Sequence, residues 1–146
     1  MKKSVLFVCV HNSARSQMAE ALLKKTCGDL FEVESCGIRP GPLNPLAVAV
    51  MAEAGLDIAQ NKSKSIFNFT MRKPTFDYVI TVCDESAGEN CPTFPRETKR
   101  LQWSFLDPST FTGTDEEKLA RTREVRDAIA ARIETWCAEV CATAAA

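Results

Sequence analysis

The chain has 146 residues, of which 45% are hydrophobic and 25% charged, and its formal net charge is −1 at pH 7. These values are ordinary for one folded domain and exclude the strongly basic surface of a nucleic-acid-binding protein. No apolar run approaches the roughly 20 residues of a bilayer span, and the N-terminal apolar run is too short for a signal peptide. We therefore expect one domain over residues 1–146, located in the cytoplasm, that binds neither nucleic acid nor membrane.

The first predicted strand and the first predicted helix are joined by a short loop. Residues 4–8 form an apolar run rich in β-formers and predict a buried strand. Residues 17–25 are rich in good helix formers and predict a helix. Cys9 ends the strand, Arg15 and Ser16 open the helix, and residues 10–14 form the loop between them.

This loop has the composition of an oxyanion site. A loop curled before a helix N-terminus aims backbone N–H groups inward, and Arg15 can hold two oxygens of the anion with its guanidinium fork. The same positive field favours a thiolate at Cys9, to which Ser16 could donate a hydrogen bond, so we expect a nucleophile aimed at the central atom of a bound oxyanion. The alternative is a packed strand-end cysteine beside a solvated arginine. The expected oxyanion-binding residues are Val10, His11, Asn12, Ser13, Ala14, Arg15 and Ser16.

The rest of the chain alternates predicted strands and helices. Strands are predicted over residues 31–36, 76–82 and 99–105, and helices over residues 45–54, 63–71 and a closing segment that follows Thr114. Asn44 before Pro45 is a typical helix start, and Thr114 with Glu117 forms a capping box. This alternation predicts a single three-layer α/β domain with a four-stranded parallel sheet flanked by helices.

Two further cysteines follow the predicted strand at residues 76–82. Cys83 ends this strand as Cys9 ends the first one, so parallel strands would place both sulfurs at one rim of the sheet. A polar segment joins Cys83 to Cys91. A thiol near an oxidised cysteine can free it by forming a disulfide, and a second thiol can move that disulfide to the surface. The alternative is that both are unremarkable loop cysteines.

The seven cysteines argue against a structural disulfide framework, because no secretory signal accompanies them. His11 is the only histidine and no C-x2-C pair occurs, so we expect neither a metal site nor a cofactor. The cysteines outside the sites above are expected to be packed or peripheral thiols: Cys27, Cys36, Cys137 and Cys141.

The motif C-x5-R-S directly after the first strand resembles that of the low-molecular-weight tyrosine phosphatases. The longer stretch C-V-H-N-S-A-R-S-Q-M-A-E-A and the segment V-C-D-E-S-A-G-E-N-C-P resemble their thioredoxin-coupled arsenate reductase branch. The motifs W-S-F-x-D-P and T-D-E-E-K extend the resemblance over essentially the whole chain. It implies that Cys9 is the nucleophile, that Arg15 and the loop amides bind the oxyanion, that Asp107 is the general acid, and that Cys83 and Cys91 form a redox relay.

The resemblance implies reduction of arsenate to arsenite, with thioredoxin as reductant and with phosphate or sulfate as competing anions. One alternative is a phosphotyrosine phosphatase working through a phosphocysteine, although such enzymes usually carry aromatic residues where this chain has Ser109 and Thr110. Another is a catalytically idle anion or redox sensor. Relatives that bind structural potassium use an acidic residue where this chain has Lys64, and we expect Lys64 to supply that positive charge itself.

Overall fold

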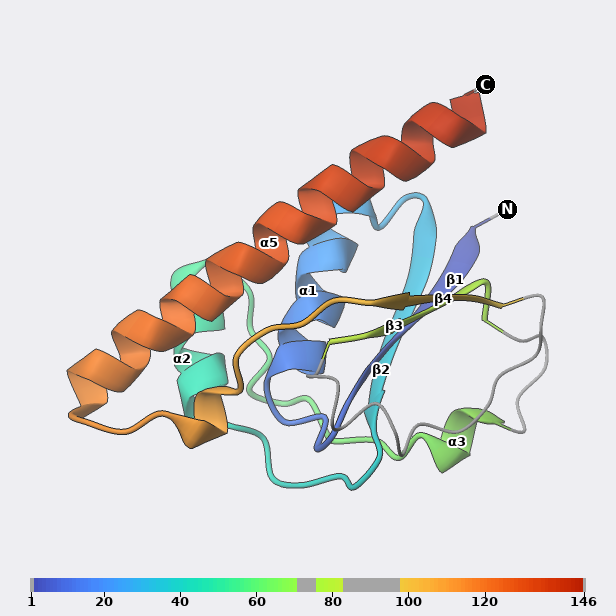
Figure 1. The fold of residues 1–146 in the computed structure, drawn as a ribbon. Coiled ribbons are helices and arrows are strands. Elements are labelled where there is room, and N and C mark those ends of the chain that lie inside the picture. Colours follow the sequence, from blue (N-terminus) through green and yellow to red (C-terminus); the bar gives the residue numbers. More distant parts are fainter. Residues whose placement is uncertain (1, 71–75, 83–97, 146) are drawn as a thin grey trace.

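Strands and helices alternate along the chain in the computed structural model, which describes residues 2–70, 76–82 and 98–145. The strands are β1 (Lys3–Cys9), β2 (Phe31–Gly37), β3 (Tyr78–Thr81) and β4 (Lys99–Gln102). The helices are α1 (Arg15–Cys27), α2 (Pro45–Glu53), α3 (Phe67–Thr70) and α5 (Asp115–Ala145), with a short 3₁₀ helix η1 (Pro108–Thr110). Figure 1 shows their arrangement.

The four strands form one parallel sheet in the order β2-β1-β3-β4. The central strand β1 is apolar on both faces, and the four side chains from Val5 to Val8 are all fully buried. Cys9 is the last residue of β1 and pairs with Gly37 at the end of β2. The predicted four-stranded parallel sheet is confirmed, with β2 at its edge.

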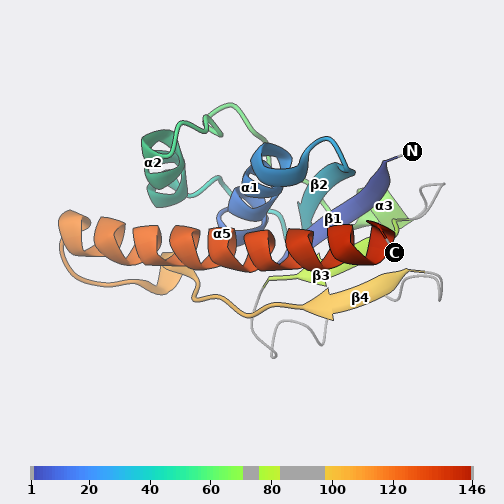
Figure 2. The same cartoon turned by 90° about the horizontal axis from the view of Figure 1, so that it is seen from above.

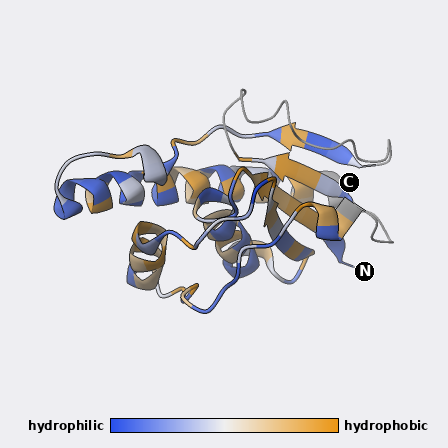
Figure 3. Cartoon of the chain, turned by 90° about the horizontal axis from the view of Figure 1, so that it is seen from below, coloured by the Kyte–Doolittle hydropathy of each residue, from blue (hydrophilic) through white to orange (hydrophobic). Residues whose placement is uncertain are grey.

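Helices cover both faces of the sheet. On one face, α1, α2 and the long α5 surround the main core, in which Ile129, Ile133 and Trp136 of α5 are buried (Figure 2). On the other face, Ile66 and Phe69 pack against the sheet around α3. Figure 3 shows hydrophobic residues concentrated along the central strands, whereas hydrophobic and hydrophilic positions alternate along α5. The predicted three-layer arrangement is therefore confirmed.

Two helix starts follow the predicted capping chemistry. The Asn44 side chain accepts a hydrogen bond from the Leu46 N–H at 2.8 Å, and Pro45 opens α2. Thr114 Oγ1 accepts from the Glu117 N–H at 3.1 Å before α5. Such caps satisfy N–H groups that the first helical turn leaves without partners, and each contributes about 1 kcal/mol.

The strand predicted over residues 76–82 is β3, Tyr78–Thr81, and the helix predicted over residues 45–54 ends at Glu53. Two other predicted elements lose three or more residues because tertiary contacts use them. The strand predicted to reach residue 105 ends at Gln102, since the following segment turns towards α1, where Arg15 donates to the Phe105 carbonyl at 3.2 Å. The helix predicted from residue 63 starts at Phe67, since the preceding residues pair with β2: the Gly37 N–H donates to the Lys64 carbonyl at 2.8 Å. Among the described helices, none combines the length and apolar composition that crossing a bilayer requires.

Candidate active site

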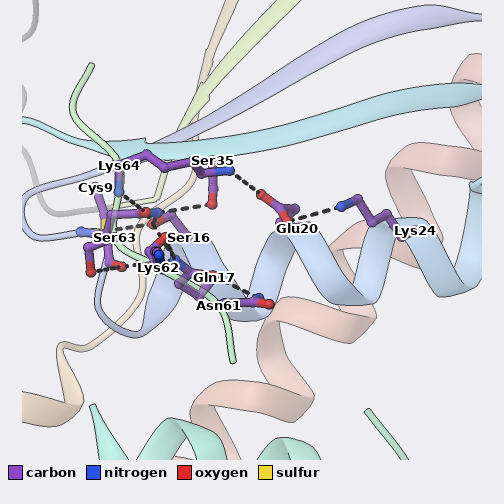
Figure 4. Close-up of polar contacts among 11 residues, drawn as sticks. Cys9, Ser16, Gln17, Glu20, Lys24, Ser35, Asn61, Lys62, Ser63 and Lys64 are labelled. Carbon is purple, nitrogen blue, oxygen red and sulfur yellow. Dashed lines mark hydrogen bonds and ion pairs between the residues drawn. The ribbon is translucent and has the colours of Figure 1, made fainter. Parts of the chain in front are cut away.

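The Cys9 sulfur lies at the centre of the loop between β1 and α1, and its residue is only 2% exposed. The Asn12 N–H donates to Cys9 Sγ at 3.1 Å, and Ser16 Oγ lies 2.8 Å from the same sulfur (Figure 4). Ser16 Oγ also accepts from Asn12 Nδ2 at 2.7 Å, so its own proton is available for the sulfur. Two polar groups therefore converge on the Cys9 sulfur and fix its position within the loop.

Asn12 organises the inside of the loop. Its φ of 51° lies in the left-handed region, which asparagine tolerates better than most residues, and its side chain is fully buried. Besides Ser16, its Nδ2 donates to Ser35 Oγ at 2.9 Å. Its Oδ1 accepts from Gln17 Nε2 at 3.0 Å and from the Lys64 N–H at 2.9 Å. One buried amide therefore ties the loop to α1, to β2 and to the segment before α3.

The segment that follows β2 runs beside the loop and fixes its backbone. The N–H groups of this segment donate to loop carbonyls in four bonds of 2.7–3.1 Å: Ile38 to Cys9, Arg39 to Val10, Gly41 to His11 and Asn44 to Ser13. Gly37 permits this approach, because a Cβ on it would lie 2.7 Å from the Asn12 nitrogen. The loop therefore takes its shape from residues far along the chain as well as from its own sequence.

The start of α1 is open to an anion. Its N-cap residue is Ala14, which makes no side-chain capping bond. The first N–H groups of a helix have no partner within the helix, and the helix dipole is positive at this end. An oxyanion in the loop would accept hydrogen bonds from these groups.

Arg15 and Asp107 meet at the site although 92 residues separate them in the sequence. The guanidinium of Arg15 is buried, and its Nη2 lies 3.4 Å from Asp107 Oδ2. Asp107 also caps η1, where its Oδ1 accepts from the Ser109 N–H at 2.9 Å. The Asp107 side chain is 26% exposed, so it stands between the buried arginine and solvent. This geometry leaves a carboxyl group beside the guanidinium that would hold an oxyanion.

An open cleft of about 710 Å³ lies beside the loop, and His11, Ser13, Leu43 and Ser109 are among its lining residues. His11 Nδ1 lies 2.9 Å from the Arg39 carbonyl oxygen. A carbonyl can only accept, so Nδ1 carries the proton and donates. This bond holds the exposed imidazole at the edge of the cleft.

A chain of polar contacts continues from the loop along α1 (Figure 4). Glu20 is 7% exposed, and its two carboxylate oxygens lie 3.2 Å from Lys64 Nζ and 3.1 Å from Lys24 Nζ. Gln17 Oε1 accepts from Asn61 Nδ2 at 3.1 Å. Lys64 therefore places a positive charge next to a buried carboxylate, directly behind the loop.

The supporting residues Gln17, Glu20, Ser35, Gly37 and Asn61 were absent from the sequence prediction. One signal was present in α1, where Gln17 and Glu20 are polar residues three positions apart beside an apolar face. Cys83 and Cys91 lie outside the described residues. The described segment that contains β3 stops at Val82, just after the strand. The Val82 N–H donates to the carbonyl of Val8, the residue before Cys9, at 2.9 Å.

Comparison with known proteins gives consistent matches over nearly the whole chain. A family model described as low molecular weight phosphotyrosine protein phosphatase matches residues 4–145. The arsenate reductases of Halalkalibacterium halodurans and Bacillus licheniformis are 44% and 45% identical to this chain over 135 residues, which are 92% of this chain and 95% of each relative.

Solved structures agree with these matches. An arsenate reductase in a phosphate-binding state is 34% identical to this chain, with a TM-score of 0.73. The match covers 94% of this chain and 98% of the solved one. A thioredoxin-dependent arsenate reductase of Corynebacterium glutamicum is 30% identical to this chain, with a TM-score of 0.75. The match covers 97% of this chain and 63% of the solved one.

Proposed function

The chain belongs to the low molecular weight phosphotyrosine protein phosphatase family, and we propose that within it this protein is an arsenate reductase. The fold alone does not separate a phosphatase from a reductase. The curated relatives at 44% and 45% identity, both named arsenate reductase, favour the reductase. The observation that carries the chemistry is the buried Cys9 sulfur with two hydrogen-bonding groups aimed at it, at the open N-terminus of α1.

In the first step, the loop amides and Arg15 bind arsenate, and the Cys9 thiolate attacks arsenic. A hydroxide leaves arsenic and takes a proton from Asp107, so it departs as water. Arg15 exchanges its contact with Asp107 for two oxygens of the anion, since its planar fork suits bidentate binding. Phosphate and sulfate are expected to compete because they share the tetrahedral shape and the charge of arsenate.

In the second step, the Cys83 thiolate attacks the Cys9 sulfur, and the electron pair of the As–S bond passes to arsenic. Arsenic is thereby reduced from As(V) to As(III), arsenite leaves, and a Cys9–Cys83 disulfide remains. Cys91 then attacks Cys83, which frees Cys9 and leaves a Cys83–Cys91 disulfide for thioredoxin to reduce. The sequence positions of these cysteines and the relative named as thioredoxin-dependent support this relay.

We place the reaction in the cytoplasm, where thioredoxin keeps thiols reduced. The whole chain, residues 1–146, would form the catalytic unit. Catalysis needs no metal or organic cofactor in this scheme, because the cysteines supply both electrons and thioredoxin returns them.

The test is arsenate-dependent oxidation of NADPH in the presence of thioredoxin and thioredoxin reductase. The native chain should turn over, whereas Cys83→Ser and Cys91→Ser should bind arsenate and lose turnover. Cys141→Ser is the matched control, because it removes a partly exposed thiol on α5. Full turnover in either relay variant would reject the relay. No arsenate-dependent oxidation, together with rapid hydrolysis of an aryl phosphate, would assign the protein to the phosphatases instead.

A further inference from the structure

One carbonyl group of the anion loop is held by two side chains. Four of the five carbonyls of residues 9–13 accept hydrogen bonds from backbone N–H groups of the segment that follows β2. The fifth, that of Asn12, accepts from Gln17 Nε2 at 3.2 Å and from Ser63 Oγ at 3.1 Å. Gln17 lies in the first turn of α1, and Ser63 lies in the segment before α3. The orientation of this carbonyl therefore depends on the side chains at positions 17 and 63.

The direction of a loop carbonyl sets the direction of the N–H group that follows it. In a planar trans peptide, the C=O and N–H bonds point in opposite directions. The His11 carbonyl points to the segment after β2, and the N–H of the same peptide, that of Asn12, donates to Cys9 Sγ at 3.1 Å. In the next peptide the Asn12 carbonyl points to Gln17, so the Ser13 N–H points away from Gln17.

The Gln17 side chain is a rigid support for this peptide. The residue is 1% exposed, and Nε2 lies 3.0–3.2 Å from three oxygens: the Asn12 carbonyl, Asn12 Oδ1 and the Lys62 carbonyl. Carbonyl oxygens can only accept, so the atom that faces them is the donating nitrogen. Oε1 in turn accepts from Asn61 Nδ2 at 3.1 Å (Figure 4). Rotation of this buried amide would leave donors and acceptors unpaired, which is costly.

We propose that Gln17 is a positioning residue for the oxyanion bound by the loop. By holding the Asn12 carbonyl, it keeps the Asn12–Ser13 peptide turned so that the Ser13 N–H faces the anion. Ser63 is the weaker support, because its single hydroxyl proton is shared with the Gly41 carbonyl. The inference rests on the oxyanion binding proposed above, and not on the reduction that follows it.

The test follows the binding of inorganic phosphate to the full-length, isotope-labelled chain by NMR, with Kd measured by isothermal titration calorimetry. In the native chain, the Ser13 N–H signal should move downfield as phosphate binds, because this N–H donates to a charged acceptor. The Ala14 N–H is the internal reference, since the carbonyl of its own peptide, that of Ser13, is held by the Asn44 N–H at 2.8 Å. The Ala14 signal should respond to phosphate in every variant.

Gln17→Met and Ser63→Ala remove the two supports. Methionine is close to glutamine in length and has no N–H to donate. Gln17→Met should reduce the Ser13 response and weaken phosphate binding by about 2- to 10-fold, the net value of one neutral hydrogen bond. The double variant should lose the Ser13 response and bind phosphate about 10- to 150-fold more weakly, the value of one hydrogen bond to a charged group.

Ser63→Ala alone keeps the proposal testable if Gln17→Met does not fold. It removes only a hydroxyl from a partly buried position, and it should reduce the Ser13 response and weaken phosphate binding by about 2-fold or more. Ser65→Ala is the matched control. Ser65 Oγ lies in the same segment but accepts from the Phe67 N–H at 3.2 Å, at the start of α3. This variant should keep the native affinity and the native Ser13 response.

Three results would overturn the proposal. They are a Ser13 signal that does not respond to phosphate in the native chain, native affinity in the double variant, and an equal loss of the Ser13 and Ala14 responses, which would indicate general damage to the loop. Arsenate-dependent oxidation of NADPH is measured separately. Absent turnover with an intact Ser13 response would reject the reductase alone, whereas turnover in the native chain with any of the three results would reject the role of Gln17 alone.

Discussion

Replacing Gly37 with alanine should disturb the anion loop without changing any residue in it. A Cβ on Gly37 would lie 2.7 Å from the Asn12 nitrogen and 2.7 Å from the His11 carbonyl carbon. Both are backbone atoms, so no side-chain rotation can relieve the contact. Gly37 itself is held by backbone bonds to Lys64 at 2.8 Å and to Ile66 at 2.9 Å. The loop or the end of β2 must therefore move.

Overpacking of this kind typically costs about 1–3 kcal/mol. If the loop takes the strain, its anion-binding shape is disfavoured by that amount, and the affinity for arsenate or phosphate falls by about 5- to 150-fold. Isothermal titration calorimetry with phosphate, which cannot be reduced, measures this directly. Thermal unfolding of the same sample shows whether the strain also lowers Tm.

Gly41→Ala is the matched control. Gly41 also lies beside the loop and donates its N–H to the His11 carbonyl at 3.0 Å. The atoms nearest to a Cβ on Gly41 would belong to the His11 side chain, the first at 3.6 Å, which is ordinary van der Waals contact. Gly41→Ala should therefore keep the native affinity. Native affinity and native Tm together in Gly37→Ala would refute the reasoning, and so would an equal loss of affinity in both variants.

Three other substitutions test the groups around the loop. Asp107→Asn should lower kcat by about 100- to 10,000-fold, since the amide cannot give up a proton as an acid. It should not weaken phosphate binding, because it also removes a negative charge that contacts Arg15. An unchanged kcat in steady-state kinetics would contradict the role of Asp107 as general acid. Ser16→Ala should lower kcat by about 10- to 100-fold, which corresponds to the energy of one hydrogen bond to the charged Cys9 sulfur. An unchanged kcat would show that this hydrogen bond does not contribute to turnover. Lys64→Met should lower the free energy of unfolding by about 1–2 kcal/mol, because Glu20 keeps only one of its two ammonium partners. For the native chain, potassium chloride should raise Tm no more than sodium chloride at equal ionic strength; a specific potassium effect would show that the Lys64 ammonium does not serve as the cation.

The sequence predicted the fold because its signals are local. The apolar run of β1, the Asn44 cap and the Thr114 capping box each specify an element through residues that are neighbours in the chain. The Cys9-to-Arg15 spacing is also local, since a strand end and a helix start fix its geometry. The role of Asp107 was predicted from the family resemblance alone, because its contact with Arg15 joins residues that are 92 positions apart in the sequence.

The support of the loop could not be predicted in the same way. Asn12 reaches Ser35 and Lys64, and Gly37 leaves room for the loop backbone, yet none of these contacts has a periodic signature in the sequence. The shortened elements have the same cause. Tertiary hydrogen bonds near Lys64 and at Phe105 override the strand and helix propensities of the residues that make them.

The two ends of α1 differ in the charge that they favour. At the N-terminal end, the helix dipole is positive and Ala14 leaves backbone N–H groups uncapped, so this end favours a bound anion beside Cys9. At the C-terminal end the dipole is negative, and burial raises the pKa of the Cys137 thiol on the neighbouring helix α5, so negative charge is disfavoured there. The binding of a charged oxyanion, as proposed for arsenate, therefore suits the N-terminal end of α1 and not its C-terminal end.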